Sequence, residues 1–184
     1  MDTHRLTDLI DLAAVQKMID VYYQAAGMPV GIIDAIDGSV LAGVGWQDIC
    51  AKFHRTNPKT LQICQAGDRY IKAHLVRGEA CHYQCLNGLW DVGVPILVSE
   101  RHLATVRLGQ FFYQDAVPDR TLFIRQAREF GFDLDDYLAA LDRVPVLERD
   151  EVNGILDFNK VLAGFITTLA ENALSLIESR ALLQ

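Results

Sequence analysis

The sequence predicts an α/β (α+β) fold, in which about five short and largely antiparallel strands form a sheet flanked by helices, with one long helix at the C-terminal end. Three observations predict this class. Short apolar runs alternate with longer segments of helical periodicity. An Asp-Gly pair stands between two apolar runs, which is a strong hairpin signal. The segment from about Glu148 to Leu183 has helical composition and no proline.

The chain begins with a predicted amphipathic helix from Thr7 to Ala26. Thr7 is a candidate N-cap, and Gly27-Met28-Pro29 stops the helix. The apolar positions that recur at helical spacing are Leu9, Ile10, Ala13, Ile19 and Tyr23.

A hairpin and two helices follow in the prediction. Strands Val30–Asp34 and Ser39–Ala42 flank the Asp37-Gly38 turn. Helices are expected over Trp46–His54 and Pro58–Leu75, because proline pushes the preceding Asn57 out of helical geometry and then suits a first helical turn.

The second half of the chain supplies the rest of the sheet. Three further strands are predicted, the last two joined by a polar turn, and two short helices follow them. The strands are Cys81–Cys85, Val92–Val98 and Leu103–Tyr113, and the helices are Pro118–Phe130 and Leu134–Leu141.

The last helix carries leucine or isoleucine at every seventh position, the spacing of a coiled-coil seam. These positions are Ile155, Leu162, Leu169, Leu176 and Leu183. Two interpretations stand: the helix packs on its own domain, or it forms a homodimer and continues past Gln184. We therefore divide the chain into a domain over residues 5–147 and a signalling and dimerisation helix over residues 148–184 that leads to an attached output module.

Composition excludes several classes of protein. The 184 residues suit one domain, and 24 acidic against 17 basic side chains give a net charge of −7. With a pI of about 5.1 and no basic run, nucleic acid is not an expected partner of this segment. No signal peptide is visible and the apolar runs are short, so we expect a cytoplasmic protein without a membrane partner.

Four cysteines, Cys50, Cys64, Cys81 and Cys85, lie close together in the sequence. Their spacing contains no C-x2-C pair, and two residues four apart on a strand are about 13 Å apart. A metal site is therefore easiest to build from Cys50, Cys64 and Cys85, with His54 or Cys81 as a fourth ligand. Zinc or an iron-sulfur cluster would suit such ligands. The alternative is that all four are reduced cysteines buried in the core.

An enzyme would use a cysteine and a histidine as nucleophile and base. Cys81 and His82 are adjacent on a predicted strand and face opposite ways. Cys50 and His54 are one helical turn apart, but the sequence shows neither an oxyanion hole nor an orienting third residue. We predict no catalytic residue.

Aromatic and polar residues near the middle of the chain favour a small-molecule cavity. The Asn87-Gly88 turn is expected to direct Trp90 and Asp91 towards one mouth of the sheet. The predicted ligand-binding residues are Trp46, Phe53, His54, Tyr83, Asn87, Trp90 and Gln110.

Taken together, several motifs resemble the PocR-type sensory domain, a PAS-like ligand-binding module of bacterial and archaeal signalling proteins. The resemblance covers about residues 5 to 175, with Val15-Gln16 where the family more often has leucine before glutamine. Its motifs are the helix around Gln16 and Asp20, the strand Pro29–Asp34 with Asp37-Gly38, the segment Trp46–His54, Cys64 with Asp68, Cys85–Leu89, Pro95-Ile96 and Leu108–Phe111.

The resemblance implies a PAS-type sheet that senses a small hydrocarbon derivative such as a diol. It implies no catalysis, and it implies that the signal passes to an attached output module, for which a histidine kinase is the first expectation. The positions that match the family's cysteines are Cys50, Cys64 and Cys85. A metal or redox sensor using these three residues is the alternative function, and a cysteine enzyme is a third.

Overall fold

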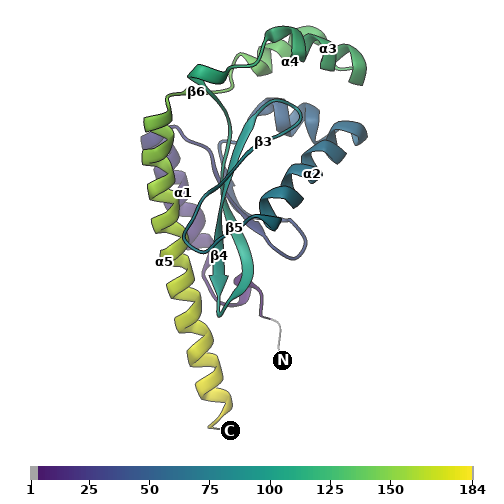
Figure 1. Ribbon diagram of the computed structural model, residues 1–184. Helices are drawn as coiled ribbons and strands as arrows, with labels where there is room; N and C mark the ends of the chain where they lie inside the picture. The colour runs from purple at the N-terminus through teal and green to yellow at the C-terminus, as the bar shows by residue number, and fades with distance from the viewer. Residues whose placement is uncertain (1–3, 184) are drawn as a thin grey trace.

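The computed structural model describes residues 4–183 and confirms the predicted fold class: an antiparallel five-strand sheet with helices on both faces. The strand order is β2-β1-β5-β4-β3. Helices α1 and α5 lie along one face, α2 lies on the other, and α3 and α4 lie at one end (Figure 1). The strands are β1 Val30–Asp34, β2 Val40–Val44, β3 Cys81–Gln84, β4 Trp90–Val98 and β5 Arg101–Tyr113, and a short β6, Val146–Leu147, pairs with the end of β5 in parallel.

The helices differ from the predicted ones mainly at their ends. The predicted helix from Thr7 is instead a 3₁₀ turn, η1 (Leu6–Asp8), followed by α1 (Leu12–Ala26). The N-cap is Asp11, whose carboxylate accepts the backbone N–H groups of Ala13 and Ala14, so Thr7 was the wrong choice. The remaining helices are α2 Pro58–Ala73, α3 Arg120–Phe130, α4 Leu134–Leu141 and α5 Arg149–Ala181.

The helix predicted over Trp46–His54 starts three residues later, at Ile49, and has π-helical rather than α-helical geometry. It is a π-helical segment, η2 (Ile49–His54). Such segments are uncommon and occur frequently at functional sites. In this chain η2 carries Cys50 and His54, both of which are buried.

Alternation along the strands separates two environments. On β1, Val30 and Ile32 face α1 and α5 within a cluster of buried apolar residues. Gly31 and Ile33 point to the opposite face, where α2 lies, because successive strand residues alternate. The same alternation places Val106 of β5 in the apolar cluster and Arg107 beside α2.

Helix α5 belongs partly to the core and partly to the surface. Leu162, Ile166 and Ala170 are buried against the sheet. Beyond them the helix projects from the domain (Figure 1), and Leu176 and Leu183 are 61% and 87% exposed. The heptad series therefore begins inside this chain's own core and ends in solvent.

One membrane-length segment was found among the described residues, and it lies in α5. The helix is long enough and apolar enough to cross a membrane by length and composition, with a mean hydropathy of 1.3 over 18 residues. A core helix of a soluble protein passes the same test, and the N-terminal half of α5 packs on β4 and β5.

Candidate functional site

A cavity of about 320 Å³ lies between the sheet and its cover of η2, α2 and the loop that joins β1 to β2. This volume is in the range of small-molecule sites. We call it the sheet cavity. The residues that line it are Ile33, Asp34, Ala35, Ile36, Gly38, Val40, Trp46, Cys50, Ala51, Arg55, Asp68, Arg69, Lys72, Asp91, His102, Thr105, Arg107 and Gln110.

The floor of the sheet cavity is built by strand alternation. Thr105 and Arg107 of β5 and Asp91 of β4 lie on the face that looks towards α2. A register shift lies between Trp90 and Asp91, and Gln110 has no partner across it because Trp90 pairs with Phe111 and Asp91 with Gly109. This irregularity lets Gln110 line the cavity.

Arg107 organises the charges on the floor. Its Nη1 donates to Asp91 Oδ2 and its Nη2 to Asp68 Oδ1, both at 3.0 Å. Asp68 also pairs with Arg55 at 3.3 Å. The two guanidinium groups and the two carboxylates therefore balance in charge.

Three polar atoms of this floor have no hydrogen-bond partner among the described residues. They are Asp91 Oδ1, Arg107 Nε and Gln110 Oε1, and each atom is buried. Buried polar atoms are almost always paired in folded proteins. All three residues line the cavity, so two acceptors and one donor without partners lie just beneath its floor.

The side chain of Asp91 lies close against Gly109 of the neighbouring strand. A Cβ placed on Gly109 would lie 2.8 Å from Asp91 Oδ1. Burial raises the pKa of Asp91, and the neighbouring Arg107 opposes that rise. Gly109 therefore leaves room for the unpaired carboxylate oxygen on the floor.

Trp46 forms an apolar wall of the sheet cavity. Gly31 and Gly43 are directly opposite each other on β1 and β2. The indole ring of Trp46 lies against both, since a Cβ on Gly43 would be 2.8 Å from Trp46 Nε1 and one on Gly31 would also meet the ring. The glycine pair lets the aromatic ring lie close to the sheet.

A small alcove of about 20 Å³ adjoins the sheet cavity, with Cys50, Arg55, Asp68, Asp91 and Gln110 lining both. Cys64 and Cys85 also line the alcove, so the three cysteines grouped from the sequence do meet there, whereas Cys81 is not among its lining residues. In residues 4–183, no group of three or more His, Cys, Asp or Glu side chains is placed to hold a metal ion.

A chain of hydrogen bonds fixes the alcove's polar groups. Gln126 donates to the backbone oxygen of Asn87, and its Oε1 accepts from the Tyr137 hydroxyl at 2.8 Å. The Tyr137 oxygen must then accept from His54 Nε2, 2.7 Å away. His54 Nδ1 is left as an acceptor for the Cys50 thiol, at 3.7 Å.

The pair of Cys50 and His54 is suited to a neutral state. Burial raises the pKa of the Cys50 thiol and lowers the pKa of His54 to about 4. A catalytic pair would need the opposite shifts, which stabilise a thiolate beside an imidazolium. The geometry expected of this pair is present, but its electrostatics favour a structural role.

The seven predicted ligand-binding residues fall into three groups. Trp46 and Gln110 line the sheet cavity. His54 and Tyr83 line the alcove, together with Gln110. Phe53, Asn87 and Trp90 line neither: Phe53 packs on Tyr137, Asn87 donates to Cys64 Sγ, and Trp90 packs edge-on against Tyr113.

The expectation that Trp90 and Asp91 point to one mouth is wrong. Asp91 lines the sheet cavity, whereas Trp90 packs in the apolar cluster beneath α5. The two residues are adjacent on β4, and adjacent strand residues face opposite sides of a sheet.

Sequence reasoning missed the charged residues of the cavity. Arg55, Asp68 and Arg107 come from η2, α2 and β5 and meet only in the folded chain. One signal was available, because a strand that reads Val-Arg-Leu carries a charge between apolar residues, and a charged side chain on the covered face of a strand needs a partner.

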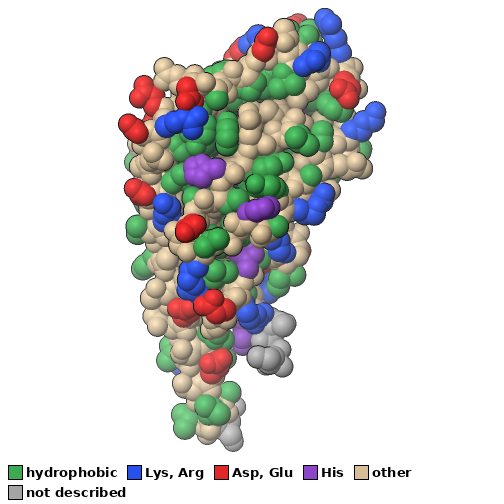
Figure 2. Space-filling model, viewed as in Figure 1, with side chains coloured by type: hydrophobic (Ala, Val, Ile, Leu, Met, Phe, Trp, Pro, Cys, Tyr) green, Lys and Arg blue, Asp and Glu red, His purple; other side chains and the backbone are tan. Residues whose placement is uncertain are grey.

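The outer surface shows no concentrated basic face in the view of Figure 2, where Lys, Arg, Asp and Glu side chains are intermixed. Arg149, for example, pairs with Asp115 at 2.7 Å.

Comparison with known proteins gives one match. A family model described as "Sensory domain found in PocR" matches residues 8–171. No curated protein and no solved structure matches significantly.

Proposed function

The chain belongs to the family of sensory domains found in PocR, and on this basis we propose that its sheet cavity binds a small hydrocarbon-derived molecule with hydroxyl groups, such as a diol. The domain is then the sensor of a signal-transduction protein and passes its state to an attached output module. It performs no catalysis itself.

The observation that carries this proposal is the set of unpaired atoms on the cavity floor. Asp91 Oδ1 and Gln110 Oε1 need donors, and Arg107 Nε needs an acceptor. A hydroxyl group both donates and accepts. A molecule with two hydroxyl groups can therefore satisfy these atoms at once, while Trp46 and Ile33 contact its carbon chain.

The charge balance of the floor favours a neutral ligand. Arg107 and Arg55 are already matched by Asp91 and Asp68. A charged ligand would leave one unbalanced charge beside Arg107 and Asp91, whose side chains are only 8% and 16% exposed, which is costly. A diol adds no charge, and bridging water can occupy the remaining volume.

The test is a binding assay with ethane-1,2-diol, propane-1,2-diol, propane-1,3-diol and glycerol. We expect at least one of them to raise the melting temperature of the wild-type domain, and its affinity to fall by about tenfold or more in Asp91→Asn and Gln110→Ala, the loss expected when a buried hydrogen bond is removed. Gln114→Ala, outside the cavity, serves as the control. Binding that is equally strong in all variants would contradict the proposal that Asp91 and Gln110 bind the ligand.

The output side of the proposal rests on α5. Leu169 is 41% exposed, Leu176 61% and Leu183 87%. We propose that a second copy of the chain covers this stripe and that the helix leads to the output module, for which a histidine kinase is the first candidate. A cytoplasmic location and the absence of a nucleic-acid partner for this segment belong to the same proposal.

A metal or redox sensor is the second candidate function, favoured by the meeting of Cys50, Cys64 and Cys85 around one alcove. Zinc or an iron-sulfur cluster would require these thiols to move closer and ionise, and burial raises the pKa of Cys85 to about 11. Metal analysis of protein purified without oxygen tests this candidate: stoichiometric metal would support it, and metal-free protein that still binds a diol would reject it.

A further inference from the structure

The loop that joins β1 to β2 forms one wall of the sheet cavity, through Asp34, Ala35, Ile36, Gly38 and Val40. We call residues 34–40 the cavity loop. The Asp34 carboxylate, which is buried, shapes it from within: its Oδ1 accepts the backbone N–H of Ile36 at 2.7 Å and that of Asp37 at 3.4 Å. A molecule in the cavity would contact this loop directly.

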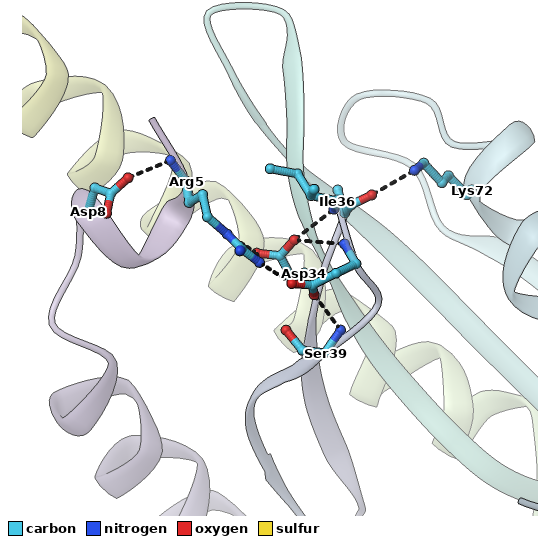
Figure 3. Close-up of polar contacts among 8 residues, drawn as sticks. Arg5, Asp8, Asp34, Ile36, Ser39 and Lys72 are labelled. Atoms are coloured by element: carbon cyan, nitrogen blue, oxygen red, sulfur yellow. Dashed lines mark hydrogen bonds and ion pairs between the residues drawn. The ribbon is translucent and has the colours of Figure 1, made fainter. Parts of the chain in front are cut away.

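Two cations hold the cavity loop from opposite sides (Figure 3). Lys72 of α2 donates to the backbone oxygen of Ala35 at 2.6 Å. Arg5 pairs with Asp34 at 3.0 Å and with Asp37 at 2.6 Å. The loop is therefore tied to the cavity cover on one side and to the N-terminal segment on the other.

The N-terminal segment Arg5–Leu9, which we call the strap, connects the loop to α5. The backbone N–H of Arg5 donates to Asp8, which closes the strap into a tight turn. Leu6 and Leu9 are buried in the same apolar cluster as Ile166 and Ala170 of α5. In Figure 1 the start of the chain and the projecting half of α5 lie towards the same end of the sheet.

We propose that the strap transmits changes in the cavity loop to the part of α5 where the helix leaves the domain. This inference rests on the proposed function, because it assigns the loop a role in sensing what the sheet cavity holds. The path runs from the cavity loop through Asp34 and Asp37 to Arg5, and from there through Leu6 and Leu9 into the apolar cluster that also holds Ile166 and Ala170. Contiguity alone does not demonstrate coupling, so the test measures the coupling itself.

The test is a double-mutant cycle that uses no ligand. Lys72→Met removes the cation that holds the loop from α2, Arg5→Gln removes the ties of the strap, and a third protein carries both changes. Amide hydrogen exchange, followed by mass spectrometry, reports on the cavity loop and on residues 162–174 of α5. We expect Lys72→Met alone to speed exchange about threefold or more in both segments.

In the Arg5→Gln background, Lys72→Met should speed exchange in the loop and leave α5 unchanged. The proposal is overturned if the response of α5 is the same in both backgrounds, or if Lys72→Met leaves either segment unchanged while Arg5 is present. Arg120→Gln is the matched control, because Arg120 pairs with Asp142 between α3 and α4, away from the strap. Failure here would leave the cavity's ligand assignment standing, since no ligand enters the experiment.

Discussion

Burial keeps His54 neutral in the folded protein, and this makes stability depend on pH. Its side chain is fully buried and its pKa falls from 6.5 to about 4. Between these values the unfolded chain binds more protons than the folded one, so the free energy of unfolding decreases as pH falls from 6.5 towards 4. Two to three pKa units correspond to about 3 kcal/mol.

We predict that His54→Gln, which keeps a polar side chain beside Tyr137, weakens this pH dependence. Urea unfolding at pH 7 and pH 4.5 should show the wild type losing about 2 kcal/mol more than the variant over that interval. The raised pKa of Asp91 acts in the opposite direction, but it is present in both proteins and cancels in the comparison. An equal loss in the two proteins would show that His54 does not titrate in this way.

At the scale of elements, the edge of the sheet depends on one side chain of α1. Gln16 Oε1 accepts the backbone N–H of Gly43 at 3.0 Å, and Gln16 Nε2 donates to the backbone oxygen of Gly43 at 3.2 Å. The same Nε2 also donates to Asp20 Oδ1 at 2.8 Å. Gly43 lies on β2, an edge strand. The side-chain amide of Gln16 thus pairs with both the N–H and the C=O of Gly43 on the side of β2 where no further strand is present, which protects the edge.

We predict that Gln16→Ala lowers the free energy of unfolding by about 1 to 2 kcal/mol, because the N–H and the C=O of Gly43 each lose a partner in a partly buried position. Gln24→Ala, an exposed position on the same helix, is the matched control and should change stability by less than about 0.5 kcal/mol. Chemical denaturation measures both. Equal effects would mean that the edge contact contributes nothing beyond helix propensity.

Local signals were sufficient to predict most elements from the sequence. The Asp37-Gly38 turn, the helix start at Pro58 and the stop at Gly27 all lie where they were expected, because each depends on a few neighbouring residues. Trp46, Gln110 and the meeting of three cysteines were also found from residue type and spacing.

Distant contacts explain what sequence reasoning missed. The π-helical form of η2 has no local signature, and it forms where Cys50 and His54 pack against Tyr137, far along the chain. Likewise Arg107 meets Asp68 across 39 positions of sequence. Charge pairing between β5 and α2 depends on strand register, which the apolar pattern alone did not determine.

At the scale of the whole molecule, α5 carries an exposed apolar stripe that the rest of the described chain does not cover. Leu162 is buried in this chain's own core, so it cannot also pack against a partner. The seam available to a second copy therefore starts near Leu169 and continues through Leu176 and Leu183, with Ile177 and Leu182 beside it. Figure 2 shows hydrophobic side chains on this projecting end. Apolar residues at seven-residue spacing on an exposed helix suit a parallel pairing of two such helices.

We predict that Leu176→Asp shifts the protein from dimer to monomer, because it places a charge at the centre of the seam at a position that contributes nothing to the domain's own core. The dissociation constant should rise by about a hundredfold or more, as measured by sedimentation equilibrium, with an unchanged melting temperature of the monomeric domain. Leu86→Asp is the control, since Leu86 is 72% exposed and lies in the β3–β4 turn, away from α5. If both variants and the wild type sediment as monomers, the stripe is not covered by a second copy. In that case α5 would have to pass the sensor's state to the output module within one chain, through the apolar cluster that it shares with Leu6 and Leu9.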